Sequence, residues 1–324
     1  MATSPRESIL ALRDHVNACI IGQQCLVERL IVTLLTGGHL LVEGVPGLAK
    51  TSAVKVLAAG LEGSFHRIQF TPDLLPADLT GTDVFNPREA SFAFQQGPLF
   101  NHFLLADEIN RAPAKVQSAL LEAMEERQVT VGNVSYPLPK PFMVMATQNP
   151  IEQDGTYPLP EAQLDRFLFH VRVDYPSREN EQAIMRLVRE RLRKGGTVAD
   201  QPGPHIKRDQ VLAAQKQILA VELAPALEEY IVRLVHATRD PAPYQEALGG
   251  WVQYGASPRA ALALDQASRA LAWLSGRDYV SPDDIQQLAP DVLRHRLLLS
   301  YRAEADGVTP DDVITELLAR VAVP

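Results

Sequence analysis

The 324-residue chain has little of what several protein classes require. Its only cysteines are Cys19 and Cys25, so a disulfide framework is excluded and we expect reduced thiols in a cytoplasmic protein. The longest uncharged apolar run covers residues 30–42, and Gly37 and Gly38 interrupt it. Such a run is too short for a membrane-spanning helix, so we expect no membrane span.

Other absences exclude further classes of protein. The first residues contain no apolar export signal, because charged side chains interrupt them at Arg6, Glu7, Arg13 and Asp14. The eight histidines are scattered without the spacing of metal ligands, so we expect neither a zinc nor an iron site. A net charge of −8 argues against a large non-specific nucleic-acid footprint.

The composition is that of an ordinary globular protein, with 46% hydrophobic and 22% charged residues, and the chain is long enough for two domains. Short apolar runs alternate with helical stretches such as 115–126, which is typical of a parallel α/β sheet. An amphipathic pattern from Gln23 to Leu34 predicts a helix before the first strand. The expected strands are Leu40–Val42, Arg67–Phe70, Phe103–Ala106, Phe142–Thr147 and Phe167–Val173.

Beyond residue 176 no further run resembles a sheet strand, so we predict an α/β domain at 1–176 and an all-helical domain at 177–324. A loop rich in glycine and proline is expected at 195–204. The helices expected in the second domain are 178–194, 208–219, 224–239, 258–274, 282–299 and 310–321. Three of them begin with a capping residue followed by proline, at Ser257, Ser281 and Thr309.

Two insertions interrupt the α/β pattern. The stretch 128–138 alternates apolar and polar residues around Gly132-Asn133, which predicts a β-hairpin with a two-residue turn. A weaker hairpin signal lies near 83–97. The alternative for both insertions is decoration of surface loops without a function.

The most informative motif is the octapeptide Gly44–Thr51, GVPGLAKT, between an apolar strand and a helix-compatible stretch. In a phosphate-binding loop, backbone N–H groups face the phosphates, Lys50 reaches their oxygens and the Thr51 hydroxyl ligates Mg²⁺. Ala49 stands where a second glycine is usual, and we expect a negative φ there, as at a helix start. The alternative is a turn followed by a surface lysine. The order of strand, loop and helix favours a nucleoside triphosphate site.

Two further strand ends carry side chains suited to this chemistry. Asp107 and Glu108 follow an apolar strand and would hold the metal shell and polarise water, respectively. Asn149 follows the next strand and could orient the attacking water. The alternatives are a solvated strand end for the carboxylates and a turn asparagine before proline for Asn149. Their position downstream of Lys50 favours the functional interpretation.

Taken together, the phosphate loop, Asp107–Ala112, Ala146–Pro150 and Leu164–Phe167 resemble the MoxR group of AAA+ ATPases over nearly the whole chain. Alanine at position 49 is usual in that group. The resemblance implies a parallel-sheet AAA+ P-loop domain with a C-terminal helical lid, hairpin insertions, and Mg²⁺-dependent hydrolysis of ATP by a homo-hexamer. It also implies a chaperone-like role in the maturation of protein complexes, with a partner that carries a von Willebrand factor A domain.

The resemblance implies roles for individual residues. Thr51 and Asp107 would hold the metal, Glu108 would be the catalytic carboxylate and Asn149 the first sensor. Arg166 resembles the arginine finger that acts on a neighbouring subunit. The implied nucleotide contacts are Gly44, Val45, Pro46, Gly47, Leu48, Ala49, Lys50, Thr51, Ser52 and Gln23.

Three assignments retain an alternative. Arg259 resembles the second sensor, and its place in the first turn of a helix, where a cation opposes the helix dipole, modestly supports this, but a surface arginine fits too. The segment Ile20–Gln23 resembles the one that brackets adenine, although its isoleucines fit core packing equally well. Arg111 follows the carboxylates and could face a neighbouring subunit.

Other functions stay open from the sequence. The ATPase subunit of a metal-chelatase complex shares the same insertions, and a nucleotide-gated binding module shares the same loop. Glu108, Asn149 and Arg166 argue against the binding module, because a switch without turnover does not need all three. A DNA-remodelling motor would use the same fold, but the acidic balance disfavours nucleic acid.

Overall fold

The computed structural model describes residues 4–87, 90–151, 155–193 and 203–324. The chain divides into two compact units: unit 1 comprises Met1–Leu159 and Val171–Ala213, and unit 2 comprises Pro160–His170 and Ala214–Pro324. This division differs from the predicted boundary after residue 176. Residues 177–213 belong to unit 1, where Ile206, for example, donates its N–H to the carbonyl of Gly60 at 2.9 Å. The loop predicted at 195–204 lies largely outside the described residues.

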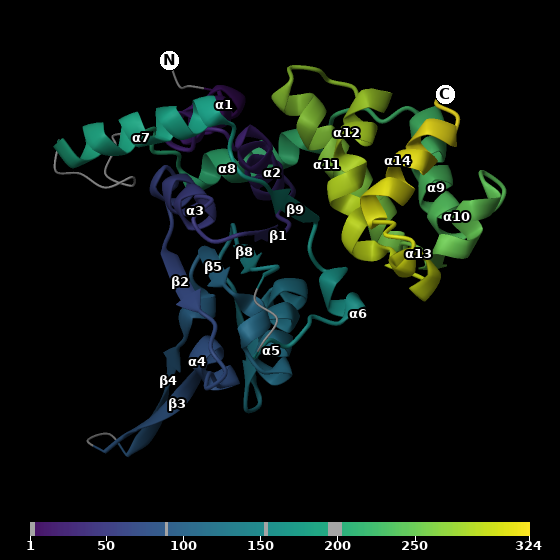
Figure 1. The fold of residues 1–324 in the computed structure, drawn as a ribbon. Helices are drawn as coiled ribbons and strands as arrows, with labels where there is room; N and C mark the ends of the chain where they lie inside the picture. Colours follow the sequence, from purple (N-terminus) through teal and green to yellow (C-terminus); the bar gives the residue numbers. More distant parts are fainter. Residues whose placement is uncertain (1–3, 88–89, 152–154, 194–202) are drawn as a thin grey trace. The chain divides into compact units, whose positions relative to one another are not determined.

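A five-stranded sheet forms the centre of unit 1 (Figure 1). The pairs β2 with β5, β5 with β8 and β8 with β1 are parallel, as predicted. Every residue of β5 is buried, whereas in the edge strand β2 only Ile68 is buried. The strand order is β2 (Phe65–Gln69), β5 (Phe103–Asp107), β8 (Met143–Gln148), β1 (Leu40–Gly44) and β9 (Phe169–Val173).

The helices of unit 1 begin and end at recognisable signals. α1 opens with a capping box in which Ser4 and Glu7 exchange side-chain hydrogen bonds, and α2 ends at Gly37 with φ 67°. The predicted apolar face of α2 is buried, which places this helix on the core. The helices are α1 (Pro5–Cys19), α2 (Gln24–Thr36), α3 (Lys50–Ala59), α4 (Pro76–Thr80), α5 (Ala114–Glu126) and α7 (Arg178–Arg193).

Both predicted hairpins form and both belong to unit 1 (Figure 1). One consists of β3 (Gly81–Asn86) and β4 (Ser91–Gln96), and the other of β6 (Gln128–Val131) and β7 (Val134–Pro137). Phe94 of the first stacks on Tyr136 of the second, with ring centroids 4.2 Å apart. The two insertions therefore contact each other through an aromatic pair.

Unit 2 is mainly helical, and the three helices predicted from serine or threonine followed by proline begin at those residues. The helix expected at 282–299 ends at Leu293, because a 3₁₀ turn (Arg294–Arg296) follows it. The expectation of no further strands is wrong, since β10 (Val252–Tyr254) pairs antiparallel with β11 (Leu298–Leu299). The helices are α6 (Glu161–Leu164), α9 (Pro225–Arg239), α10 (Glu246–Trp251), α11 (Pro258–Leu274), α12 (Pro282–Leu293), α13 (Tyr301–Ala305) and α14 (Pro310–Arg320).

The helix α8 (Arg208–Ile218) crosses the division between the units. In the described part of the chain, no helix has both the length and the apolarity that crossing a membrane requires.

Candidate functional site

The predicted phosphate loop joins the end of β1 at Gly44 to the start of α3 at Lys50. Two of its residues are left-handed, Gly47 with φ 88° and Ala49 with φ 59°. The negative φ expected at Ala49 is therefore wrong. A left-handed conformation costs an L-residue about 1–2 kcal/mol, and alanine, whose side chain is a single methyl, keeps that strain small compared with a branched residue. The helix start compensates in part, because the Ala49 carbonyl accepts from the N–H of Ala53 at 2.9 Å.

The ammonium group of Lys50 points back into the loop. It donates to the carbonyl of Gly44 and, at 3.3 Å, to the carbonyl of Gln148 at the end of β8. Burial lowers the pKa of Lys50 from its usual value, while Asp107, Glu108 and Glu43 oppose that shift. A partly desolvated ammonium between the loop and the neighbouring strand end suits an anionic ligand.

Asp107 ends β5 and is almost buried, with 9% of its surface exposed. Its Oδ1 accepts from the Thr147 hydroxyl at 2.6 Å, and its Oδ2 lies 3.5 Å from the Thr51 hydroxyl. Arg67 of β2 donates to the same Oδ2 through Nε at 3.0 Å and Nη2 at 2.6 Å. The fold thus brings Thr51 and Asp107 together, as the sequence predicts for a shared metal.

Glu108 follows in a left-handed conformation with φ 57°. Its N–H donates to the Thr147 hydroxyl at 2.9 Å. The carboxylate accepts from the amide of Gln69 at 2.8 Å and pairs with Arg111 at 3.1 Å. Arg111, predicted to face another subunit, therefore contacts Glu108 within its own chain.

Asn149 is buried at the end of β8, and its Oδ1 accepts from the N–H of Ile151 at 3.2 Å. A cavity of about 300 Å³ brings together the loop, the strand ends and this asparagine. Its donor set fits a phosphate chain with a hard cation, because hydroxyl and carboxylate oxygens are the ligands that Mg²⁺ takes while it keeps several waters. The lining residues are Pro46, Gly47, Leu48, Ala49, Lys50, Thr51, Ser52, Asp107, Glu108, Thr147, Gln148 and Asn149.

A second cavity, of about 160 Å³, shares Gly47, Leu48, Ala49 and Ser52 with the first. Its other walls are mostly apolar and come from Cys19, Ile20, Ile21, Gln23, Pro176, Ile184, Leu187, Val188 and Arg191. An apolar pocket beside a phosphate cradle suits a nucleobase. Gln23 lines this pocket, but its amide donates to the carbonyl of Asp174 at 3.2 Å.

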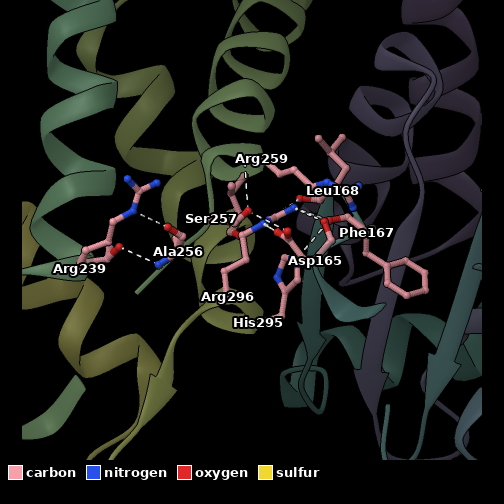
Figure 2. Close-up of polar contacts among 11 residues, drawn as sticks. Asp165, Phe167, Leu168, Arg239, Ala256, Ser257, Arg259, His295 and Arg296 are labelled. Atoms are coloured by element: carbon pink, nitrogen blue, oxygen red, sulfur yellow. Dashed lines mark hydrogen bonds and ion pairs between the residues drawn. The ribbon is translucent and has the colours of Figure 1, made fainter. Parts of the chain in front are cut away.

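Arg166 and Arg259 both belong to unit 2, where one polar network holds the segments that carry them (Figure 2). Arg296 pairs with Asp165 at 2.7 Å and donates to the carbonyls of the same segment. The hydroxyl of Ser257 donates to Asp165 at 2.7 Å and accepts from the N–H of Arg259 at 3.1 Å. Asp165 therefore connects the segment that carries Arg166 with the capped end of α11 that carries Arg259.

Sequence reasoning missed three residues at the carboxylates: Thr147, Arg67 and Gln69. Thr147 bonds to both Asp107 and the N–H of Glu108. Arg67 and Gln69 are the polar positions of β2 that contact these carboxylates. Their spacing of two within a predicted strand was a usable signal, but only the strand order shows that β2 lies beside β5.

The fold and the site define the class of this protein. Residues 39–169 match the model of the ATPase family associated with various cellular activities (AAA), and residues 251–317 match that of the AAA lid domain. With a phosphate loop on a parallel sheet, this chain is an AAA+ ATPase that hydrolyses ATP.

Comparison with individual proteins gives the family. The chain is 50% identical to "Chaperone MoxR1" of Mycobacterium tuberculosis over 96% of its length and 81% of the relative's. It is 30% identical to "Protein MoxR" of Methylorubrum extorquens over 96% and 94%. A crystal structure from Cytophaga hutchinsonii superposes with a TM-score of 0.91 at 46% identity, over 99% and 96% of the two chains. The chain belongs to the MoxR family of AAA+ ATPases.

Proposed function

We propose that this ATPase is Mg²⁺-dependent and uses hydrolysis to remodel or mature protein complexes, as a chaperone-like ring. The observation that carries the first part is the convergence of Lys50, Thr51 and Asp107 on one cavity, next to an apolar pocket of a size for a nucleobase. The second part is supported by 50% identity to a relative that is named a chaperone.

In this proposal the loop from Gly44 to Ser52 cradles the phosphates, and Lys50 turns from the backbone carbonyls to the phosphate oxygens. Thr51 and Asp107 would hold Mg²⁺, which would supply positive charge against the phosphate oxygens. Glu108 accepts the proton of the attacking water, and Asn149 orients that water.

The remaining cations act between subunits in this proposal. Arg166 stabilises the charge on the γ-phosphate of a neighbour, and Arg259 serves as the second sensor. Because Asp165 and Ser257 connect their segments within unit 2, the two arginines are held in a common frame. The assembly that this requires is a homo-oligomer, for which we propose a hexamer. The client is a protein complex, and the partner carries a von Willebrand factor A domain.

The experiment that tests the proposal uses Glu108→Gln, which removes the general base and keeps Thr51 and Asp107. This variant should bind ATP, hydrolyse it at least about 10²-fold more slowly, and retain whatever the ring engages. Affinity purification with ATP from the native cell should enrich a small set of proteins. Lys50→Ala is the matched empty control, because it removes the cation that offsets phosphate charge, and calorimetry should show no nucleotide binding.

The identity of the retained proteins decides between the functions. A von Willebrand factor A protein with a multi-subunit enzyme would support the chaperone function, whereas chelatase subunits or DNA would support the alternatives. If Glu108→Gln and Lys50→Ala retain the same proteins, remodelling is wrong. If folded Lys50→Ala binds nucleotide as the parent does, the loop is not the site.

A further inference from the structure

The edge strand β2 contacts both carboxylates at the end of β5. Arg67 and Gln69 are two residues apart, so they project from the same face of the strand. Arg67 donates to Asp107, and Gln69 donates to Glu108. One short strand at the edge of the sheet therefore holds both acidic groups of the candidate site.

The oxygen of Asp107 that faces Thr51 has no capacity for a further donor. Oδ2 receives Arg67 Nε at 3.0 Å, Arg67 Nη2 at 2.6 Å and the Thr51 hydroxyl at 3.5 Å. A carboxylate oxygen offers about two lone pairs, and the two Arg67 nitrogens occupy both, while the Thr51 hydroxyl lies at the limit of hydrogen-bond distance. Oδ1 is bonded to Thr147 at 2.6 Å. A metal ion or its bound water can reach Oδ2 only where a present donor leaves.

Arg67 also links Asp107 to Glu108. Its Nη2 donates to Oε1 of Gln69 at 2.9 Å, and the amide nitrogen of Gln69 donates to Glu108 at 2.8 Å. The sequence of contacts is therefore Asp107, Arg67, Gln69, Glu108. The hydrogen bond from Arg67 Nη2 to Gln69 Oε1 therefore helps to hold the guanidinium beside Asp107.

We propose that the Arg67 guanidinium is the resting counter-cation of Asp107 and that it leaves Oδ2 when a divalent cation binds with nucleotide. This inference rests on the proposed nucleotide and metal site. It adds to the site a residue that none of the site motifs contains.

The exposure of the pair makes the exchange feasible. The Arg67 side chain is 44% exposed, so its guanidinium regains water when it leaves. The Asp107 side chain is 12% exposed and needs a cation at all times, because an unpaired carboxylate is poorly solvated there. A divalent cation supplies that charge in place of Arg67.

The test measures Mn²⁺ binding to the protein saturated with a non-hydrolysable ATP analogue, by electron paramagnetic resonance of free Mn²⁺. Arg67→Gln removes the competing cation, so the dissociation constant for Mn²⁺ should fall at least about threefold. Arg67→Lys keeps the charge but loses the two-nitrogen contact, and it should give a smaller fall. Unchanged or weaker Mn²⁺ binding in Arg67→Gln would overturn the exchange.

Arg172→Gln is the matched control for a general change of charge. Arg172 lies on β9 of the same sheet, its side chain is 42% exposed, and it pairs with Glu43 at 3.9 Å. Arg172→Gln removes the same charge as Arg67→Gln but no contact with Asp107, so Mn²⁺ binding should stay near the parent value. An equal gain in both variants would mean a non-specific field effect and would overturn the proposal.

A double variant tests the link between Gln69 and Arg67. Gln69→Leu removes an acceptor that holds Arg67 in place, so it should tighten Mn²⁺ binding less than Arg67→Gln does. The double variant should bind Mn²⁺ no more tightly than Arg67→Gln alone, because both changes act through Arg67. Independent, multiplying effects would overturn the link.

Calorimetry with the analogue in the presence of Mg²⁺ separates this inference from the proposed function. If the parent binds no analogue, the nucleotide site itself is wrong. If every variant binds the analogue and the Mn²⁺ constants do not move, only the role of Arg67 is wrong.

Discussion

Each unit contains an arginine–aspartate pair beside candidate machinery, and the two pairs differ in burial. The Arg67 side chain is 44% exposed in unit 1, whereas that of Arg296 is 3% exposed in unit 2. The guanidinium of Arg296 donates to the carbonyls of Asp165, Phe167, Leu168 and Val292. Arg296 therefore binds the backbone as well as the carboxylate of Asp165 (Figure 2). The comparison shows that a buried arginine is tied to the backbone at several points, whereas the half-exposed Arg67 side chain, in the part of the chain that the structure describes, contacts only side chains, which leaves it free for the exchange proposed above.

The largest expected effect concerns Arg166, which is the residue after the aspartate of the buried pair. Arg166 follows Asp165, which Arg296 holds in place. If Arg166 is the finger of a neighbouring site, Arg166→Ala should lower turnover about 10³–10⁵-fold with little change in nucleotide affinity. Steady-state hydrolysis and calorimetry measure the two quantities.

A mixture of variants shows whether Arg166 acts between subunits. Arg166→Ala and Lys50→Ala subunits, each inactive alone, should regain some hydrolysis when mixed, through sites that combine an intact Lys50 with an intact Arg166. Parent-level turnover of Arg166→Ala alone, at concentrations where the parent assembles, would contradict this role.

The next effect is on stability and compares the two pairs directly. Arg296→Ala leaves Asp165 without its cation and frees several carbonyls, so it should lower the free energy of unfolding by about 3–5 kcal/mol. Arg67→Ala leaves the nearly buried Asp107 without its cation but removes a guanidinium that is itself half-exposed, so it should lower the free energy of unfolding by less, about 1–3 kcal/mol. Far-UV circular dichroism in urea follows the unfolding of both units, and tryptophan fluorescence follows unit 2 separately, because Trp251 and Trp273 both lie there. Equal losses in the two variants would break the comparison.

A smaller effect follows from a histidine beside the buried pair. Burial, with the nearby charge of Arg296, holds the pKa of His295 well below 6.5. The folded state therefore binds fewer protons than the unfolded state below pH 6.5, and stability falls as pH drops. The slope should reach about 1.4 kcal/mol per pH unit from this group. Urea unfolding of unit 2 at pH 7.5, 6.5 and 5.5 measures it, and His295→Gln should flatten the profile. An unchanged profile in that variant would exclude His295 as the cause.

The smallest expected effect concerns the two hairpins, which contain two aromatic pairs that differ in exposure. Phe94 and Tyr136 stack between the hairpins, whereas Phe92, whose ring lies 5.3 Å from that of Phe85, is 72% exposed. Tyr136→Ala should lower stability by about 0.5–1.5 kcal/mol and leave basal hydrolysis within a few-fold. Phe92→Ala is the control and should change neither. Thermal unfolding and basal turnover measure these effects, and a loss of turnover in Tyr136→Ala would mean that the hairpin contact supports catalysis itself.

Several elements could be predicted because their signals are local. Glycines and a lysine at fixed spacing mark the loop between β1 and α3, and serine or threonine before proline marks the starts of α11, α12 and α14. The turn at Gly132 likewise announces the hairpin of β6 and β7. In each case neighbouring residues along the chain decide the backbone conformation, so the sequence alone suffices.

The partners of the acidic groups could not be predicted in this way. Arg67 and Thr147 are both 40 positions from Asp107, and they reach it only because β2 and β8 flank β5 in the sheet. The positive φ of Ala49 and Glu108 also depends on surrounding contacts, since local preference disfavours it for both residues. Likewise, residues 160–170 join unit 2 because the buried Arg296 binds their carbonyls. Local sequence therefore determined the elements and the loop, whereas only tertiary packing decided which charges meet, because strand order and burial are properties of the whole chain.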